Sequence, residues 1–370
     1  MNKQRICIVG DGLSGLMTSI VLGQISNIEV TLISKKVSKI KDKRTTAISD
    51  ANLKFLKEKI IGLNSKLFWP SKKIELFYET AKGKINFLNL NEKKSNLMYV
   101  FENDKFKKIL FKEISKKKIK IIRKNLNNLK ELENYNLAIL CMGGNSKIYN
   151  EITKPREIQK DYNEIAVTGY VKHTFKNLNT SQFFLKDGPL AILPFSKNQF
   201  SFVWSLKKEF YNNNIKGIIN LLKIKLSDIL RKDQKKISIS NIQSYPISLN
   251  LKKDYFGKNI LILGEGLHTI HPVAGQGFNL VLRDIKKLEE IVKYYSGLGI
   301  SIKNSYALSD FNKSRKPENL IMGIGIDLTR NFFQRNKYLD PFKESILRNI
   351  SNNETLKKFS KIISNKGISF

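Results

Sequence analysis

Three glycines near the start of the chain have the spacing of a phosphate-binding turn. Gly10, Gly12 and Gly15 form a GxGxxG signature between an apolar run at residues 5–9 and apolar residues at helical spacing over residues 13–25. The apolar run predicts a buried parallel strand, and the signature predicts a tight turn into a helix. Unpaired N–H groups and the positive end of the helix dipole at such a turn attract a pyrophosphate. We therefore expect a dinucleotide-binding unit at this end of the chain.

The next strand departs from the usual dinucleotide-binding pattern. Residues 28–33 predict a second parallel strand, which in such folds usually ends in an acid that binds the adenosine ribose. Here that position is Ser34, followed by Lys35 and Lys36. A serine hydroxyl can still hydrogen-bond a ribose, whereas the two lysines would suit a 2′-phosphate. An NADP-dependent Rossmann reductase is therefore one alternative.

A second glycine-rich stretch lies about 250 residues further along the chain. Residues 259–263 predict a strand that ends at Gly264, and residues 275–292, which include Gly275 and Gly277, have helical periodicity. A Rossmann reductase does not explain this block. The two signatures together favour one cofactor held between distant loops, with a substrate chamber formed by the chain between them.

Several further segments carry a family resemblance. They are residues 44–49, 99–103, 188–194, 202–205, 245–249 and 315–330. Together with the two glycine signatures, they resemble the flavin-dependent aromatic hydroxylases of ubiquinone biosynthesis, the UbiH/UbiF/Coq6 group of the para-hydroxybenzoate hydroxylase superfamily. The resemblance covers most of residues 1–335.

This resemblance implies a fold and a set of site residues. The fold would be α/β, with a Rossmann-like FAD-binding domain interleaved with an antiparallel-sheet substrate domain. Pro272, against the flavin ring, and His271 would be the candidate catalytic residues. His268 and His271 would also shape the flavin bed through hydrogen bonds. The residues that would bind FAD are Gly10, Gly12, Leu13, Ser14, Gly15, Ser34, Arg44, Glu265, Gly275, Gln276, Gly277 and Asn279.

The chemistry that the resemblance implies belongs mainly to the cofactor. A reduced flavin reacts with O2 to give a C4a-hydroperoxide, which hydroxylates an electron-rich phenol ring. The substrate would be a polyprenylated phenol intermediate of ubiquinone biosynthesis. The protein must then position the ring, exclude water and present hydrogen-bond donors to the flavin. The sequence identifies no general base for this reaction.

One position raises the question of how the flavin is reduced. The segment at residues 137–146 resembles a family motif that contacts flavin and nicotinamide, but Met142 replaces its aspartate. The reductant could therefore be NAD(P)H or an electron-carrier protein. A third alternative is a flavin-fold protein with lost or altered turnover that serves as an assembly subunit.

The histidines and cysteines predict no metal site and no disulfide framework. His268 and His271 lie around a loop, without helical zincin spacing or a cluster of acids, so we expect no metal ligand. His173 falls in a predicted strand and is interpreted as structural. Cys7 and Cys141 lie in apolar runs and are interpreted as core residues, which fits a reducing compartment.

Length and pattern predict two interleaved domains in the 370 residues. The expected FAD-binding domain comprises residues 1–70, 96–160 and 252–335. The expected substrate domain comprises residues 71–95 and 161–251, where alternating apolar residues predict an antiparallel sheet. Residues 336–370 are expected to form a C-terminal helical segment.

The net charge of +34 is the composition's most unusual property. Most of the excess is lysine spread over the chain, a pattern that an A/T-rich genome also produces, and no nucleic-acid-binding motif accompanies it. The first 25 residues lack the continuous apolar core of a signal peptide, and no window is long enough to span a bilayer. We expect a soluble cytoplasmic protein, with peripheral contact at the inner face of the membrane and with other ubiquinone-biosynthesis proteins as open alternatives. The stretch at residues 215–230 predicts a basic amphipathic helix that either lies on lipid headgroups or faces the core.

Overall fold

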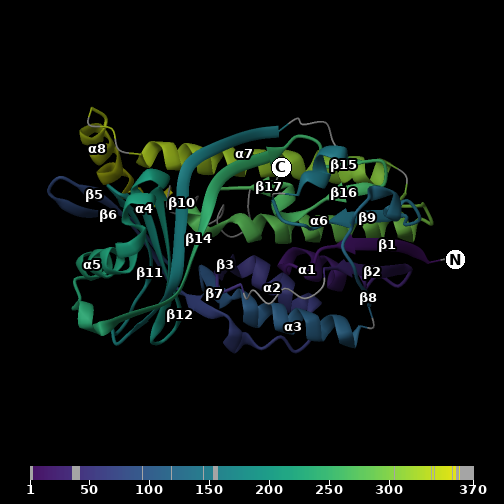
Figure 1. Ribbon diagram of the computed structural model, residues 1–370, viewed down its shortest axis with the longest axis horizontal. Helices are drawn as coiled ribbons and strands as arrows, with labels where there is room; N and C mark the ends of the chain where they lie inside the picture. The colour runs from purple at the N-terminus through teal and green to yellow at the C-terminus, as the bar shows by residue number, and fades with distance from the viewer. Residues whose placement is uncertain are drawn as a thin grey trace.

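Two large β-sheets stand side by side in the molecule (Figure 1). The computed structural model describes residues 3–35, 42–93, 95–117, 119–144, 146–152, 157–303, 305–334, 336, 338–351, 353–355 and 358. This arrangement confirms the α/β fold class expected from the sequence.

The first sheet contains the strands that the sequence predicts for a dinucleotide-binding unit. Its strands follow the order β15-β16-β9-β1-β2-β8, and every pair except β15–β16 is parallel. Their bounds are β1 (Gln4–Val9), β2 (Ile28–Ser34), β8 (Lys120–Arg123), β9 (Leu137–Leu140), β15 (Phe256–Gly257) and β16 (Ile260–Ile262). The β-branched runs predicted as parallel strands are buried in one core with helices α1 (Leu13–Leu22), α3 (Asn103–Lys116) and α6 (Gly277–Gly297).

The second sheet has eight strands in the order β17-β14-β10-β13-β12-β11-β5-β6. Their bounds are β5 (Lys73–Thr80), β6 (Gly83–Asn91), β10 (Glu157–His173), β11 (Thr180–Leu185), β12 (Gly188–Ser196), β13 (Gln199–Lys207), β14 (Ile237–Lys252) and β17 (His268–Thr269). The sheet is antiparallel, as expected, except that β5 and β11 run parallel. Those two strands are joined by a long stretch of chain rather than a hairpin, and a long crossover permits parallel pairing.

A small third sheet connects the other two. It consists of β3 (Thr45–Ser49), β7 (Met98–Glu102) and β4 (Trp69–Ser71), and α2 (Asp50–Lys59) follows β3 directly. Ser49 caps α2, since its side chain accepts a hydrogen bond from the N–H of Asn52. The hydroxyl of Thr45, on β3, is hydrogen-bonded to the hydroxyl of Ser201, on β13 of the second sheet. This hydrogen bond links the small third sheet to the second sheet.

Helix α7 (Ser305–Phe333) runs along one side of the molecule past both sheets, and α8 (Asp340–Ser351) follows it (Figure 1). Helix α7 contacts α6 beside the first sheet and β14 in the second sheet. Helix α8 packs on β6 through Leu347, which is buried with Phe87 and Leu90. The division of the chain into domains stays a prediction.

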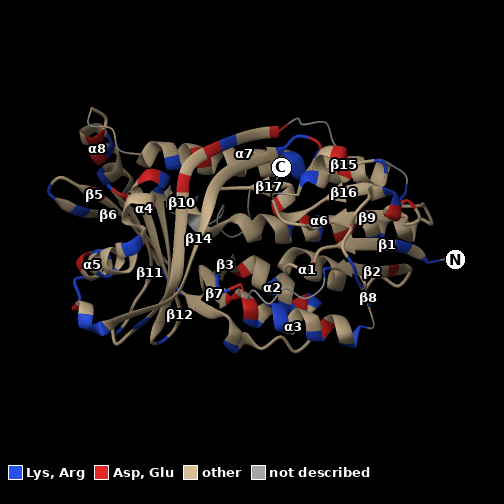
Figure 2. Cartoon of the chain, in the orientation of Figure 1, with Lys and Arg blue, Asp and Glu red and all other residues tan. Residues whose placement is uncertain are grey.

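The predicted amphipathic stretch at residues 215–230 forms a short turn and then α5 (Ile218–Leu230). Its residues Ile218, Leu222, Leu226 and Ile229 are buried against the second sheet, so the structure favours the core-facing interpretation. Lysine and arginine residues occur on many helices and strands of the chain (Figure 2). Among the described helices, none combines the length and the apolar character that crossing a bilayer would require. Helix α4 (Lys208–Asn214) precedes this stretch.

Candidate cofactor and substrate site

The first glycine signature forms the turn that its spacing predicts. Gly10 has φ +113°, and a Cβ there would lie 2.2 Å from the carbonyl oxygen of Cys141. A Cβ on Gly15 would lie 2.0 Å from the carbonyl oxygen of Gly10. A Cβ on Gly12 would meet no described atom within 4 Å. Gly10 and Gly15 are therefore required by the protein's own packing, whereas Gly12 faces open space.

A cavity of about 260 Å³ lies at this turn. It is found at the carboxyl ends of β1, β2 and β9, where strand order reverses in a parallel sheet and ligands usually bind. Its walls are Val9, Gly10, Asp11, Gly12, Ile33, Lys35, Lys124, Leu126, Cys141, Met142 and Gly143. The N-terminus of α1 opens beside it with Gly12 as N-cap and no side-chain cap, so its first N–H groups remain available to a ligand.

Ser34 takes part in a polar cluster beside the same cavity. It is buried, and its hydroxyl accepts a hydrogen bond of 2.6 Å from Nη1 of Arg123. The same Arg123 atom lies 3.9 Å from a carboxylate oxygen of Asp11. Sequence reasoning did not identify Arg123, because it lies 89 residues from Ser34 and on a different strand. Lys36 lies outside the described residues.

The two glycine signatures meet in space. Gly264 has φ +79°, and a Cβ there would lie 3.0 Å from the hydroxyl of Ser14 on α1. Leu13, the first residue of α1, packs partly buried against the core of the first sheet. Glu265 follows in a short 3-10 turn, in which it is exposed while Gly264 and Gly266 are buried. Loops about 250 residues apart in sequence thus form one continuous surface.

Met142 lines the cavity at Gly10 and Gly12. Its N–H donates to the Tyr149 hydroxyl at 3.0 Å. Cys7 and Cys141 are both buried, and burial raises the pKa of each thiol to about 12. These values fit the core role predicted for the two cysteines and leave them unreactive.

The second signature folds into a turn that leads to α6. Gly275 has φ +61° and ends a 3-10 turn, Val273–Gly275, and Gln276 is the N-cap of α6. Oε1 of Gln276 is buried and has no hydrogen-bond partner among the described residues. A Cβ on Gly277 would meet only Ile270, at 4.0 Å. A buried acceptor without a partner is unusual in a finished core and marks a place where a ligand can donate a hydrogen bond.

Asn279 has a different environment from the other predicted cofactor contacts. Its amide nitrogen donates to the carbonyl oxygens of Ala47 at 3.0 Å and Gly275 at 3.1 Å. Its amide oxygen accepts from the N–H of Ser49 at 2.9 Å and from Asn52 at 2.7 Å. Both ends of the side chain are thus used to tie α6 to β3 and α2.

Arg44 immediately precedes β3 of the small third sheet. Its guanidinium forms a two-pronged ion pair with Asp42, at 2.8 and 2.9 Å, and stands over the ring of Tyr245. Burial disfavours the Asp42 carboxylate, but its hydrogen bonds to Arg44 prevail and lower the pKa of Asp42. The same ion pair raises the pKa of Arg44. Arg44 is therefore a fixed cation at the edge of the site.

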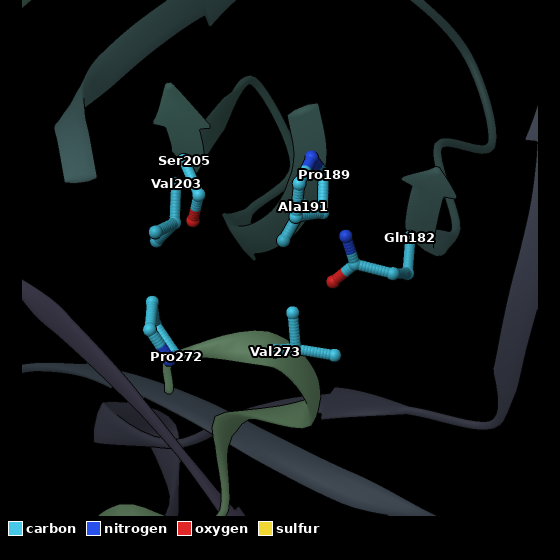
Figure 3. Close-up of a pocket in the computed structure, with 7 residues that line it drawn as sticks. All are labelled: Gln182, Pro189, Ala191, Val203, Ser205, Pro272 and Val273. Carbon is cyan, nitrogen blue, oxygen red and sulfur yellow. The ribbon is translucent and has the colours of Figure 1, made fainter. Parts of the chain in front are cut away.

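A second, much smaller cavity lies between the loop of the second signature and the second sheet. It has a volume of about 10 Å³ and is lined by Gln182, Pro189, Ala191, Val203, Ser205, Pro272 and Val273. Figure 3 shows Pro272 and Val273 on one side and the five side chains from β11, β12 and β13 on the other. The polar groups of Gln182 and Ser205 have no hydrogen-bond partner among the described residues. The sheet therefore presents an apolar surface with two free polar groups to Pro272.

His268 and His271 are each hydrogen-bonded to a carboxylate. Nε2 of His268 lies 2.7 Å from Asp284, and Nε2 of His271 lies 3.0 Å from Glu164. The described residues contain no group of three side chains that could hold a metal ion. His173, at the end of β10, is buried beside Phe175 and Phe200, and burial lowers its pKa.

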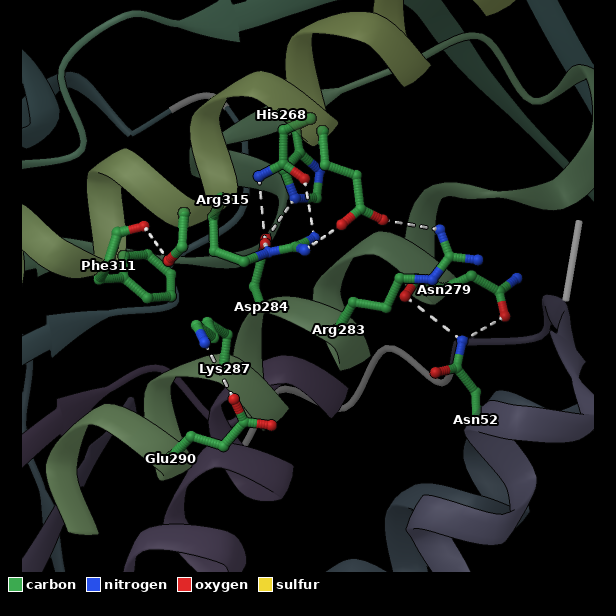
Figure 4. A network of polar contacts seen from close by, with 12 residues as sticks. Asn52, His268, Asn279, Arg283, Asp284, Lys287, Glu290, Phe311 and Arg315 are labelled. Atoms are coloured by element: carbon green, nitrogen blue, oxygen red, sulfur yellow. Dashed lines mark hydrogen bonds and ion pairs between the residues drawn. The ribbon is translucent and has the colours of Figure 1, made fainter. Parts of the chain in front are cut away.

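Asp284 of α6 is the centre of a buried polar network (Figure 4). Arg315 of α7 donates to it at 2.6 Å, and Asn319 donates at 3.1 Å. Burial favours the protonated acid, yet the charges of Arg315 and His268 prevail and lower the pKa of Asp284. The network thus joins His268 of the second signature to helices α6 and α7.

These features fit a dinucleotide that carries a planar ring. The open side of Gly12 and the free N-terminus of α1 suit a pyrophosphate. The N-terminus of α6 and the unpartnered Oε1 of Gln276 suit a polar ring edge. FAD has both parts, so the residues present fit that cofactor.

Comparisons with known proteins agree with this geometry. Residues 136–297 match the family of FAD binding domains. The solved p-nitrophenol 4-monooxygenase PnpA of Pseudomonas putida has a TM-score of 0.77 at 11% identity, with both chains fully covered. The flavin-dependent brominase Bmp2 has a TM-score of 0.73 at 13% identity, over 97% of this chain and 92% of that one. This chain therefore shares its fold with these two solved proteins.

Curated relatives narrow the resemblance within this fold. The chain is 27% identical to the mitochondrial ubiquinone biosynthesis monooxygenase COQ6 of Dictyostelium discoideum, over 58% of this chain and 53% of that protein. It is 28% identical to the ubiquinone hydroxylase UbiL of Rhodospirillum rubrum, over 44% and 38%. It is also 28% identical to the 3-demethoxyubiquinol 3-hydroxylase of Escherichia coli, over 43% and 40%. The chain thus matches about half or less of each relative's length, and the comparisons confirm its resemblance to the Coq6 and UbiH type of FAD monooxygenase.

Proposed function

We propose that this protein is an FAD-dependent aromatic-ring hydroxylase that acts on a polyprenylated phenol in ubiquinone biosynthesis. One observation supports this most strongly: the two glycine signatures meet at Ser14 and Gly264, while the loop at Pro272 faces the second sheet. A Rossmann reductase would use the first signature and leave the second without a role. The likeness to ubiquinone hydroxylases supports the substrate class.

FAD, when bound, supplies the reaction with O2, and the chain supplies position and environment. The proposed cofactor contacts are Gly10, Gly12, Leu13, Ser14, Gly15, Ser34, Arg44, Glu265, Gly275, Gln276, Gly277 and the backbone of Asn279. Pro272 is proposed to lie against the ring. The apolar surface formed by Ala191 and Val203 excludes water from the substrate ring.

Gln182 and Ser205 are proposed to orient the substrate. They provide the two free polar groups opposite Pro272. A phenol hydroxyl can donate to one of them and accept from the other. The present volume of about 10 Å³ is too small for a ring, so substrate entry requires the loop and the sheet to move apart.

The reductant is proposed to be NAD(P)H or an electron-carrier protein. Met142 faces the cavity at Gly10, where the related motif has an acid. Met142→Asp should speed the anaerobic bleaching of the FAD by NADH or NADPH if nicotinamide binds through this loop. An unchanged rate would favour an electron carrier or another route. Contact with the membrane surface and with other ubiquinone-biosynthesis proteins is also proposed, since a prenylated substrate resides in the bilayer.

The decisive experiment uses the purified full chain. It should carry the visible absorbance of oxidised FAD, and NADH or NADPH with O2 and a short-chain prenylated phenol should yield a product heavier by one oxygen by mass spectrometry. FAD without product from any electron donor would favour the assembly-subunit alternative. A colourless protein that takes up no added FAD would contradict the proposal.

A further inference from the structure

The His271 ring is held in one tautomer by two neighbours. It is fully buried, and its Nδ1 accepts a hydrogen bond of 3.2 Å from the N–H of Val273. A backbone N–H can only donate, so Nδ1 carries no proton and Nε2 does. Nε2 then donates to Oε2 of Glu164, 3.0 Å away. Both ring nitrogens are thus occupied by the protein.

Glu164 is in turn held by Arg330 of α7. Nη2 of Arg330 donates to Oε1 of Glu164, and Nε lies 3.4 Å from Oε2. The guanidinium stands 4.1 Å from the centre of the Tyr162 ring, whose hydroxyl donates to Asp327 at 2.7 Å. Burial opposes the Glu164 carboxylate, but the bonds from His271 and Arg330 prevail and lower its pKa. The carboxylate is thus charged and bonded from two sides.

The backbone of β10 places Glu164 at this position. Asn163 has φ +52°, in the left-handed region that asparagine tolerates better than most residues. The pairing of β10 with β14 shifts register between Asp161 and Glu164. A bulge of this kind redirects the next side chain, and here it turns Glu164 toward the loop of the second signature.

We propose that Glu164 and Arg330 are positioning residues that act through His271. They hold Pro272 and Val273 at their distance from the second sheet. The three-membered group of His271, Glu164 and Arg330, which we term the loop clamp, ties the loop to β10 and α7 at once. It fixes the wall opposite Gln182 and Ser205. His271 then serves to orient the loop and transfers no proton in the reaction. This inference rests on the proposed function, because it assumes that the loop faces bound FAD.

The test compares variants of the full chain. Glu164→Gln keeps the shape of the side chain but removes the charge that holds both partners. Arg330→Lys keeps the charge but loses the fork of donors. The control is Glu157→Gln, because Glu157 also lies on β10 and is paired with buried Lys252 at 2.8 Å, outside the group of His271, Glu164 and Arg330. Thermal unfolding shows whether each variant folds.

The first readout is the state of His271, observed by long-range 1H–15N NMR with labelled histidine. The chain has three histidines, and the signal missing in His271→Gln identifies the one of interest. The wild type should show protonated Nε2 and unprotonated Nδ1. Glu164→Gln should shift this signal or mix the tautomers, Arg330→Lys should shift it less, and Glu157→Gln should leave it unchanged. The same His271 signal in wild type and Glu164→Gln would overturn the clamp.

The second readout is bound FAD. Glu164→Gln should change the visible absorption and circular dichroism of the flavin and weaken FAD binding about tenfold, as expected for the loss of a charged hydrogen bond. Glu157→Gln should alter neither. Equal effects of Glu164→Gln and Glu157→Gln on the flavin would mean that Glu164 only contributes to the stability of the fold, and would contradict the inference. A wild type that binds no FAD would instead defeat the proposed function, while the NMR comparison would still decide on the clamp.

Discussion

The two cavities of the candidate site are built by different means. The larger one, about 260 Å³ at the first glycine signature, lies at the ends of parallel strands, with Gly10, Gly12 and Gly143 in its wall. The smaller one, about 10 Å³ at Pro272, is closed by a loop that side chains hold in place. Around the first, glycines leave space. Around the second, His268 and His271 connect the loop to buried carboxylates.

This difference separates a preformed part of the site from an adjustable one. A cradle made by strand ends and a helix N-terminus moves only if the sheet itself moves. A loop held by ion pairs can shift when a partner is lost or a ligand enters. The firm end suits a cofactor that stays bound, and the closed end suits a substrate that must enter and leave.

The largest effect should come from Gly15→Ala. The added Cβ would lie 2.0 Å from the Gly10 carbonyl oxygen, which is backbone and cannot move aside cheaply. We expect a loss of at least about 3 kcal/mol in unfolding free energy, in the range of severe core overpacking, together with loss of FAD. Urea unfolding followed by circular dichroism measures the first effect, and visible absorbance measures the second.

Gly12→Ala is the matched control for that prediction. Its Cβ would meet no described atom within 4 Å, so the unfolding free energy should change by less than about 1 kcal/mol. FAD binding should still weaken at least tenfold, since the methyl group enters the space proposed for the pyrophosphate. Full FAD occupancy in Gly12→Ala would show that the phosphates lie elsewhere.

At the loop end, Asp284→Asn should destabilise the fold. The substitution removes one of the two carboxylates paired with buried Arg315, the other being Glu318, so we expect a loss of about 1.5–3 kcal/mol, the range for a hydrogen bond to a charged group. The pKa of Asp284 is lowered in the folded state from 3.8, so the carboxylate's contribution is fully present above that pH and disappears as the pH falls through the lower folded value. Urea unfolding of both proteins at pH 7 and pH 3 should therefore show the difference shrinking in acid.

An equal difference at both pH values would mean that the charge of Asp284 is not what stabilises the network. Lys59→Met offers a control. Lys59 of α2 is paired at 2.8 Å with buried Glu289, which lies on α6 as Asp284 does but further from the loop. This substitution should destabilise the fold without changing the visible spectrum of bound FAD, whereas Asp284→Asn should change both.

Sequence pattern predicted the backbone-built end well for a physical reason. The run at residues 5–9, the three glycines and the following helix form a local unit. Gly10 and Gly15 each meet a steric demand from a nearby backbone carbonyl, whereas Gly12 faces open space. The second signature was likewise found as a strand, a turn and a helix. Such features are written in consecutive residues.

The side-chain-built end could not be predicted in the same way. Glu164 and His271 are 107 residues apart, and Glu164 and Arg330 are 166 apart. An isolated glutamate in a strand with polar neighbours predicts an exposed face, and only the bulge at Asn163 turns it inward. Gln182 and Ser205 similarly gain meaning only when β11 and β13 are placed opposite Pro272.

A moderate effect is expected for Gln182→Leu at the substrate side. The substitution keeps the size of the side chain but removes a polar group proposed to orient the phenol. The KM for a short-chain prenylated phenol should rise about tenfold, in proportion to one lost hydrogen bond, and FAD binding should stay unchanged. Gln199→Leu, at the far end of β13, is the control. A rise in KM of the same size in both variants would remove Gln182 from the substrate site.

The smallest effect should come from Arg123→Gln at the cofactor end. Arg123 donates to Ser34 at 2.6 Å and lies near Asp11, so it is beside the position where other dinucleotide folds place an acid for the ribose. Its side chain is 39% exposed, and exposed charges contribute weakly, so we expect FAD affinity to fall only about threefold. Titration of apoprotein followed by flavin fluorescence measures this change, with Arg5→Gln, at the opposite end of β1, as control. If Arg123→Gln abolished FAD binding, the cofactor end would depend on side chains as strongly as the loop end, and the contrast between the two cavities would not hold.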